Sequence, residues 1–385
     1  MKRQLIKNGM IHDAVHPEAF QADILIEEGK IREIGQNLSE EDAEVLDAAG
    51  CQVYPGFVEA HCHLGLHGHA MGFEGQDYNE MTEILMPELR AVDGINPQDE
   101  TFALAREGGV TCVATGPGSA NVLGGTFAAV KTYGKRVDDM IVKFPVAMKC
   151  AFGENPKRCY REKNNSSRMS TASKLREMLY QARDYQERKD AAESIKERPK
   201  YDPKMEALLP VIRGEIPLKA HAHQVNDLFT AIRIAKECGV KLTLEHCTDG
   251  SLIAEELAAE GYPVCVGPSL GHASKIELKN KSFKTPGILA KAGCQVSIIT
   301  DSPVIPQQYL PLCAGLAVKE GMDAFAALQA ITINPAKHIG IEDRVGSLEV
   351  GKDGDVVIAD GDPMVSSTQI LYTIIDGEIR FQHEA

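Results

Sequence analysis

The sequence predicts an α/β protein in which a (β/α)8 TIM barrel carries a small β-sandwich formed from both ends of the chain. Strand patterns with tight turns dominate both ends of the 385 residues, whereas strand and helix patterns alternate through the middle. Several middle strands end in histidine or aspartate, and barrel enzymes carry their catalytic residues at the carboxyl ends of their strands. We therefore expect a barrel over 56–345, with a helical insertion at about 165–205, and a composite sandwich from 1–55 and 346–385.

Both ends of the chain are rich in strand patterns. Near the N-terminus, 24–26 and 30–34 have strand patterns on either side of a tight turn. Near the C-terminus, 354–358 has a strand pattern, and 370–375 and 378–380 predict a hairpin around the Asp-Gly at 376–377. Neither end has enough strands for a core of its own, so we expect the two ends to pair.

The middle of the chain predicts alternating strands and helices, with one lapse. Before residue 200 the expected strands lie at 57–60, 110–115, 127–131 and 145–149, and the expected helices at 99–107 and 170–198. The pattern shows no helix between the last two of these strands. Alternation resumes afterwards. The expected strands there lie at 216–223, 240–246, 262–267 and 295–301, and the expected helices at 227–238, 251–260, 285–292, 310–320 and 323–331.

Composition and charge exclude several classes of function. A formal net charge of −14 argues against nucleic-acid binding and against docking on an anionic membrane. Ten cysteines without a Cys-x-x-Cys motif indicate reduced thiols. No signal-peptide core opens the chain, and no apolar run approaches the roughly 18 residues of a membrane span. We expect a cytoplasmic protein that binds a small molecule.

The first expected barrel strand ends in His61-Cys62-His63 and is followed by a glycine-rich tract. Residues two apart on a strand point the same way, so His61 and His63 can face one point at the end of the strand. Imidazole is the commonest metal ligand in proteins. A single His-x-His also occurs by chance, and the motif gains weight only from the strands that follow.

Three later strands also end in residues that bind metals. His221 and His223 end one strand, His246 ends the next, and Asp301 ends the last. Each has a plain structural alternative, since a histidine can be a hydrogen-bonded core residue and an aspartate can cap a helix. Their shared position at strand ends predicts a joint metal site.

The order of these motifs resembles the amidohydrolase superfamily, and most closely its imidazolonepropionase-like and Xaa-Pro dipeptidase-like branches. The resemblance covers nearly the whole chain. Residues 55–63 resemble the first-strand signature of the superfamily, and 334–337 followed by 346–355 resemble its passage from barrel to sandwich. It implies one or two divalent metal ions per chain, with zinc expected and manganese or iron(II) as alternatives.

The resemblance also assigns metal ligands by matched position. The implied ligands are His61, His63 and Asp301 for the more buried metal, and His221 and His246 for a second one. His223 points inward by strand period and competes with His221. Lys149 matches the place of a lysine that, in two-metal members, is carboxylated and bridges the metals. In mononuclear members this bridge is absent, and Glu154 is a rival carboxylate ligand.

These ligands imply hydrolysis of a carbon–nitrogen bond in an amide, a cyclic amide or a dipeptide. Bound Zn²⁺ lowers the pKa of a water to about 7 and so provides hydroxide at neutral pH. We expect Asp301 to act as general base and acid, with His246 as the second catalytic residue. A deaminase on the same metal site is an alternative within the class, and a non-catalytic binding homologue is an alternative outside it.

Substrate-binding residues are harder to predict. Arg158 lies in the loop after the fourth strand, where it can grip a carboxylate or form a surface salt bridge. His223, Gln224 and His272 follow strand ends and are further candidates. Gln224 stands where imidazolonepropionase-like enzymes have an acid, and because glutamine cannot shuttle a proton, imidazolonepropionase activity itself is disfavoured. Analogy with other barrels suggests a homo-oligomer.

Overall fold

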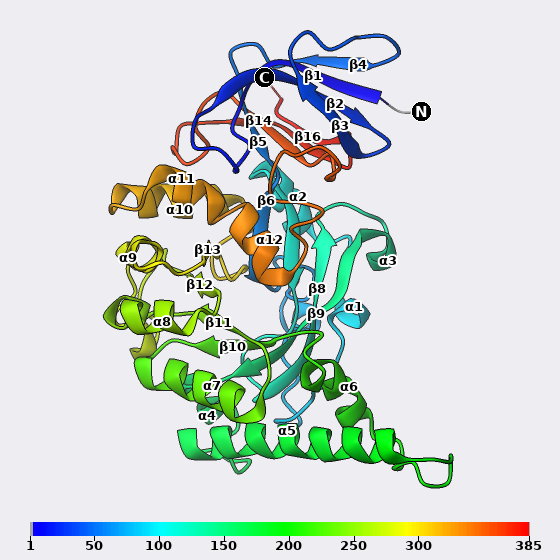
Figure 1. Ribbon diagram of the computed structural model, residues 1–385. Coiled ribbons are helices and arrows are strands. Elements are labelled where there is room, and N and C mark those ends of the chain that lie inside the picture. Colours follow the sequence, from blue (N-terminus) through cyan, green and yellow to red (C-terminus); the bar gives the residue numbers. More distant parts are fainter. Residues whose placement is uncertain (1–2, 385) are drawn as a thin grey trace.

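The computed structural model describes residues 3–384, which form an α/β fold with two eight-stranded sheets (Figure 1). One sheet is built from the two ends of the chain and lies at the top of the view. The other is built from the middle of the chain, and helices lie along its outer side. Each sheet packs an apolar cluster of its own.

The terminal sheet alternates strands from the two ends of the chain. Its strands are β1 (Arg3–Ile11), β2 (Phe20–Glu27), β3 (Lys30–Gly35), β4 (Glu44–Asp47), β5 (Gln52–Pro55), β14 (Val356–Ala359), β15 (Ile370–Ile375) and β16 (Glu378–Gln382). The order is β16-β15-β14-β5-β1-β2-β3, with β4 paired to β1. Antiparallel pairing of β5 with β14 joins the ends, so the hydrogen bonding forms one continuous sheet. Ile6, Val53 and Val356 are among the residues of its buried core.

The central sheet is a nearly closed barrel. Its strands, in hydrogen-bonded order, are β6 (Phe57–Cys62), β7 (Val110–Thr115), β8 (Leu123–Lys131), β9 (Ile141–Ala151), β10 (Leu218–Ala222), β11 (Leu242–His246), β12 (Val264–Val266) and β13 (Val296–Ile298). The turn at 330–331 fills the gap between the first and last strands. The amide of Val58 donates to Ile331 O at 2.9 Å, and the amide of Ile298 donates to Ala330 O at 2.9 Å.

The barrel departs from the regular (β/α)8 pattern at β8. This strand pairs antiparallel with both β7 and β9, whereas the other neighbours in the barrel pair in parallel. Only residues 116–122 join β7 to β8. A parallel crossover needs a dozen or more residues, so this short glycine-containing link permits only a reversal of direction. The sequence pattern predicts the strand, but neither its reversal nor the four-residue helix at 137–140 that follows it.

The helices are α1 (Ala91–Gly94), α2 (Glu100–Glu107), α3 (Val137–Met140), α4 (Glu154–Cys159), α5 (Arg168–Ala191), α6 (Pro203–Ile212), α7 (Val225–Cys238), α8 (Ala254–Glu260), α9 (Lys284–Ala292), α10 (Leu310–Lys319), α11 (Ala324–Gln329) and α12 (Ile333–Ile339). Short 3-10 turns lie at 73–75, 250–252, 276–278 and 307–309. The helix expected over 170–198 stops at Ala191, and α6 was not expected. None of the helices within residues 3–384 is long and apolar enough to cross a membrane.

Candidate metal centre

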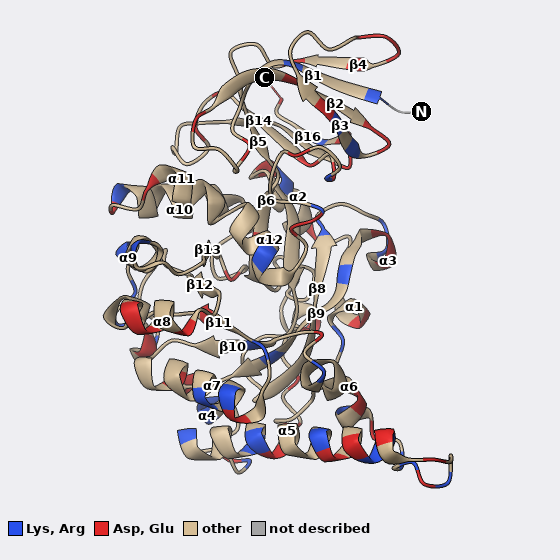
Figure 2. Ribbon diagram, viewed as in Figure 1, with Lys and Arg blue, Asp and Glu red and all other residues tan. Residues whose placement is uncertain are grey.

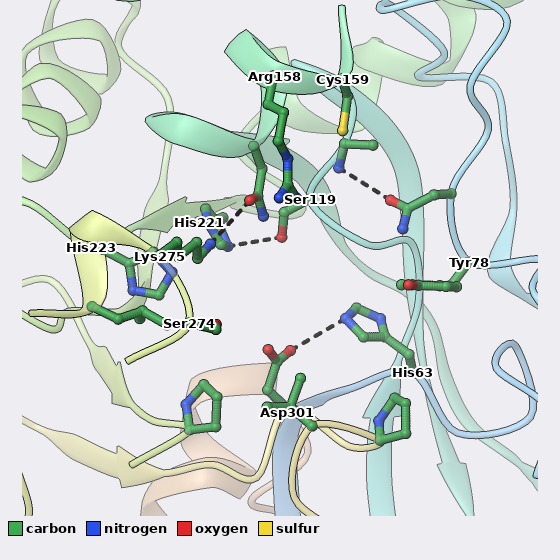
Figure 3. A pocket seen from close by; sticks show the side chains of 17 residues that line it. His63, Tyr78, Ser119, Arg158, Cys159, His221, His223, Ser274, Lys275 and Asp301 are labelled. Atoms are coloured by element: carbon green, nitrogen blue, oxygen red, sulfur yellow. Dashed lines mark hydrogen bonds and ion pairs between the residues drawn. The ribbon is translucent and has the colours of Figure 1, made fainter. Parts of the chain in front are cut away.

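Histidine and aspartate side chains at the carboxyl ends of β6, β10 and β13 line one cavity of about 350 Å³. His246, at the end of β11, lies behind His221, and their ring centroids are 4.4 Å apart. Figure 3 shows His63 and Asp301 on one side of this cavity, with His221 and His223 on the other. Two groups of three side chains have ligand atoms within 4.8 Å of one another. They are His61, His63 and Asp301, and His221, His223 and His246.

Alternation along β6 places His61 and His63 as the sequence predicts. His61 is fully buried, and its Nδ1 lies 2.9 Å from Glu245 Oε2. His63 donates from Nδ1 to Gly116 O at 2.7 Å. Their Nε2 atoms face Asp301 Oδ1 at 3.7 Å and 3.3 Å respectively. Cys62, between them, points away and packs in an apolar cluster on the other side of the strand.

His246 and Asp301 reach the two groups of potential ligands through left-handed backbone conformations. His246 has φ 76° and Asp301 has φ 53°, values that non-glycine residues seldom adopt. Glu245 and His246 are consecutive and would point to opposite faces of a regular strand. The turn at His246 lets both side chains point into the barrel. Such strained residues cluster at functional sites, and strand alternation alone does not predict them.

Each of the five imidazoles is held at Nδ1 by a neighbour. His61 pairs with Glu245, and His63 and His246 donate to the carbonyls of Gly116 and Gly267. The remaining two partners are hydroxyls. Ser119 Oγ lies 2.8 Å from His221 Nδ1, and Thr248 Oγ1 lies 2.8 Å from His223 Nδ1. Hydrogen bonding at one ring nitrogen fixes the tautomer and leaves the other nitrogen available as a ligand.

The opposite nitrogens fit a divalent metal ion. His221 Nε2 and His246 Nε2 are buried and have no hydrogen-bond partner among residues 3–384. A buried polar nitrogen without a partner is costly unless an ion or another group satisfies it. Burial lowers the pKa of His221 and His223 well below the usual value and that of His246 to about 4, so these rings are neutral, as metal binding requires.

Lys149 lies on β9 beside the first group. Its Nζ is 3.0 Å from His61 Nε2, and the side chain is fully buried. Burial lowers the pKa of Lys149 to about 8, although Asp301 and Glu245 act in the opposite direction. The lysine therefore lies near the carboxyl end of β9, within reach of His61.

His61 is held at Nδ1 by a buried ionic network. The sequence pattern does not reveal this network. Glu245 accepts hydrogen bonds from His61 Nδ1 at 2.9 Å and from Lys219 Nζ at 2.8 Å on one oxygen. Its other oxygen accepts from His338 Nε2 at 2.8 Å. Burial acts to raise the pKa of Glu245, but Lys219 and His338 hold it well below its usual value. Charged residues at inward positions of β10 and β11 are the signal that could have revealed this network.

Glu277 is a second residue that sequence reasoning missed. Its Oε1 lies 3.8 Å from His221 Nε2 and 3.7 Å from His223 Nε2, and it also pairs with Lys275. Glu277 Oε2 accepts from the backbone amide of Glu154 at 2.9 Å. It sits in a 3-10 turn within the loop after β12, where no strand pattern marks it.

The expected substrate residues divide into two sets. Arg158 and His223 line the cavity, and Figure 3 shows Arg158 extending toward Ser119. Gln224 and His272 do not line it. Gln224 instead accepts a hydrogen bond from Arg168, and the carbonyl of His272 accepts one from Lys281 at 3.0 Å.

Two other clusters of potential ligands lie outside the cavity. Cys265 is grouped with Glu245 and His338 in the buried network. Asp353, Asp355 and Asp376 surround Lys131, whose Nζ lies 2.7–3.2 Å from them. Lys30 and Arg344 also pair with Asp353, so the second cluster is held by cations of the chain. In the first cluster, Glu245 and His338 already bond to each other.

Comparison with known proteins places these motifs in context. The model of the amidohydrolase family matches residues 52–380. The amidohydrolase tasK of Hapsidospora irregularis is 29% identical over 394 aligned residues, which cover 93% of this chain but only 40% of that protein. The chain thus spans less than half the length of this curated relative.

Solved structures show the same architecture. An amidohydrolase from Thermotoga maritima is 39% identical and superposes with a TM-score of 0.95, covering 98% of this chain and all (100%) of that one. A Xaa-Pro dipeptidase with bound methionine is 18% identical with a TM-score of 0.59, covering 99% of this chain and 100% of that chain. The latter likeness concerns the fold.

Proposed function

The chain belongs to the amidohydrolase family, and from this premise we propose that it is a metal-dependent hydrolase of a carbon–nitrogen bond in a small carboxylate-bearing amide, cyclic amide or dipeptide. One observation carries this proposal. Five imidazoles, each held at Nδ1, direct Nε2 toward the same region as Asp301. This donor set suits zinc, with manganese and iron(II) as alternatives.

We assign the ligands in two groups. His61, His63 and Asp301 form the first, and His221 and His246 form the second, with His223 as the rival of His221. We further propose that Lys149 bridges the two groups as a carboxylated side chain, because its buried Nζ lies 3.0 Å from His61 Nε2. A divalent metal bound here lowers the pKa of a water to about 7 and so makes hydroxide available near neutrality.

The remaining chemistry falls to side chains of the chain itself. Asp301 lines the cavity and is held by His63, so its carboxylate is placed to accept a proton from the attacking water and to deliver it to the leaving nitrogen. His246 is our second catalytic residue, since its Nε2 has no hydrogen-bond partner among the described residues and its ring lies 4.4 Å from that of His221.

Arg158 is the proposed anchor for the substrate carboxylate. Its side chain lines the cavity, and no hydrogen bond or ion pair joins it to another of the residues 3–384. A guanidinium binds a carboxylate through two parallel hydrogen bonds, which fixes the position of the scissile bond. We place this chemistry in a barrel unit of 56–345, with 1–55 and 346–385 forming a separate structural unit.

The test is a panel of N-acetyl amino acids, dipeptides and cyclic amides incubated with the zinc-loaded chain. Release of a carboxylate and an amine would support the proposal, whereas release of ammonia from an amidine-type substrate would favour a deaminase. Asp301→Asn should lower kcat by about 100-fold or more, because it removes the general base. Metal-loaded protein that hydrolyses no member of the panel would contradict the proposal.

A further inference from the structure

We propose that a second pocket, beside the metal centre, binds a second acidic group of the substrate, so that the preferred substrates are amides of aspartate or glutamate. We call it the basic pocket and define it by the charged residues that line it: Glu154, Lys157, Arg158, Arg161 and Arg168. This inference rests on the proposed function and specifies its substrate class.

The basic pocket adjoins the catalytic cavity. It has a volume of about 400 Å³ and is lined by α4, the segment that follows it, the first residue of α5 and Ile276 of the 3-10 turn at 276–278. Arg158 lines both spaces. A substrate whose first carboxylate reaches Arg158 can therefore extend a second group directly into the basic pocket.

The charge of the basic pocket opposes that of the chain. Four cationic side chains line it against one carboxylate, Glu154, although the chain as a whole carries a formal net charge of −14. Figure 2 shows basic positions on α4 and at the start of α5. A concave surface of one sign concentrates ligands of the opposite sign.

Most of these cations are not neutralised within the protein. Within residues 3–384, Lys157 and Arg158 make no hydrogen bond or ion pair. Arg161 approaches only Glu162, at 3.5 Å on the open surface, where such a pair contributes little. The positive charges of the basic pocket are therefore available to a ligand.

Arg168 is the one cation of the basic pocket that is neutralised by another described residue, and this contact holds its side chain in place. Its Nε lies 2.9 Å and 3.1 Å from the two Asp227 oxygens, and its guanidinium also contacts Gln224. Arg168 opens the 24-residue helix α5, whose first turn contains no acidic residue. A cation at this positive helix end is unfavourable for the helix itself. The contact with Asp227 fixes its position, so the free positive charge of the basic pocket comes from Lys157, Arg158 and Arg161.

The spacing of the cations over two adjoining pockets should favour a substrate with two carboxylates over a substrate with one. Arg158 would take the carboxylate next to the scissile amide, and Lys157 with Arg161 would take the side-chain carboxylate of an aspartyl or glutamyl unit. An isosteric amide cannot pair with these cations and should bind more weakly.

Binding is tested first, without any need for turnover. Isothermal titration of the zinc-loaded chain compares glutarate with glutaramate, its near-isosteric monoamide. We expect glutarate to bind about tenfold more tightly, and Lys157→Met/Arg161→Met to abolish that difference. Neither residue lines the catalytic cavity, so metal content should not change.

The matched control removes two positive charges elsewhere. Arg198→Met/Lys200→Met lies beyond the far end of α5, which is about 36 Å long at 1.5 Å per residue. This variant should retain the preference for glutarate. Two results would overturn the proposal that the basic pocket binds a second acidic group. One is equal binding of glutarate and glutaramate by the unmodified chain, and the other is an unchanged preference in Lys157→Met/Arg161→Met.

Turnover of N-acetylglutamate and N-acetylglutamine then separates the two proposals. We expect kcat/KM to favour the glutamate substrate by about tenfold, mainly through KM, and the Lys157→Met/Arg161→Met variant to lose this preference. If glutarate binds selectively but neither amide is hydrolysed, the proposed function fails and the basic pocket stands. Stimulation of N-acetylglutamine hydrolysis by added glutarate would instead assign the pocket to an effector and overturn its substrate role.

Discussion

Among single residues, the hydroxyl groups behind His221 and His223 have the clearest consequence for metal binding. Ser119 and Thr248 each contact a ring nitrogen at 2.8 Å and leave the opposite nitrogen turned to the cavity. Partners of this kind orient a ligand before the metal arrives, so that less conformational freedom is lost on binding. Their removal should weaken metal binding without unfolding the barrel.

We predict that Ser119→Ala lowers metal affinity by about 10-fold, the lower end of the effect usual for such partners. The measurement is competition for zinc with a chelator of known affinity. Ser274→Ala is the matched control, because Ser274 lines the same cavity but bonds to no imidazole in the described chain. Equal losses in the two variants would show that the contact to His221 does not orient the ring.

Strand alternation and motif order predict most of the site residues. His61, His63 and His221 occupy inward positions of regular strands, where a period of two suffices. His246 and Asp301 also join the two groups of potential ligands, but through positive φ angles that no sequence period encodes. Glu277 escaped notice because its loop position depends on the packing of distant elements. Local pattern thus predicts residues on strands and misses those on loops.

The cysteines allow a second test at this scale. Seven of the ten are buried, and three, Cys51, Cys159 and Cys294, are partly exposed. Burial raises the pKa of Cys112 and Cys150 to about 12, which suppresses the reactive thiolate. We predict that iodoacetamide at pH 8 labels only the three partly exposed thiols in the native protein. Peptide mass spectrometry locates the label, and modification of Cys112 or Cys150 without denaturant would contradict this arrangement.

Of the elements, β8 differs most from the predicted fold. The sequence shows the strand, but it shows neither the short α3 that follows nor which way the strand runs. Direction is decided by the short link from β7, which closes as an antiparallel turn. The antiparallel strand still completes the barrel wall and carries Phe127, whose ring lies 5.2 Å from that of His61.

The end of β8 also connects the two sheets through Lys131. Its Nζ lies 2.7 Å and 2.8 Å from the Asp355 oxygens and 2.9 Å from Asp353. Asp353 and Asp355 precede β14 of the terminal sheet, and the lysine is buried. Loss of one partner from such a buried network leaves uncompensated charge in a region that water cannot reach.

We predict that Lys131→Met lowers the free energy of unfolding by about 3–5 kcal/mol, because the buried Asp355 loses its cation, whereas Asp353 keeps Lys30 and Arg344. Urea unfolding of the metal-loaded chain, followed by circular dichroism, measures the change. Lys135→Met removes an exposed lysine four residues along the chain and should have almost no effect. A similar small effect for Lys131→Met would mean that the network does not stabilise the contact between sheets.

In the whole molecule, motif order predicted more than composition did. The paired chain ends and the ligands at strand ends were visible in the sequence because both follow from the order of elements. The basic pocket was not, since a net charge of −14 hides a local cluster of cations. Lys157 and Arg161 form part of a pocket only because the fold brings α4 and the start of α5 beside the cavity.

Metal content is the property of the whole molecule that tests most of these assignments together. Protein purified with bicarbonate and without chelator should contain two metal ions per chain, because two groups of three ligands flank Lys149. Plasma mass spectrometry gives the count. Removal of the metals should destabilise the fold, by about 2.7 kcal/mol per site for metal present at 100 times its dissociation constant.

The Lys149→Met variant tests the bridging role of Lys149 separately from the roles of the other proposed ligands. Without the bridge, we expect the chain to retain about one metal ion, since His61, His63 and Asp301 remain a complete tridentate group. Two ions in Lys149→Met would exclude Lys149 as a bridge, and one ion in the unmodified chain would make the site mononuclear. If the unmodified chain took up no zinc, manganese or iron(II) even after reloading, the metal site itself would be wrong, because five oriented imidazoles and one carboxylate would then have no ion to bind.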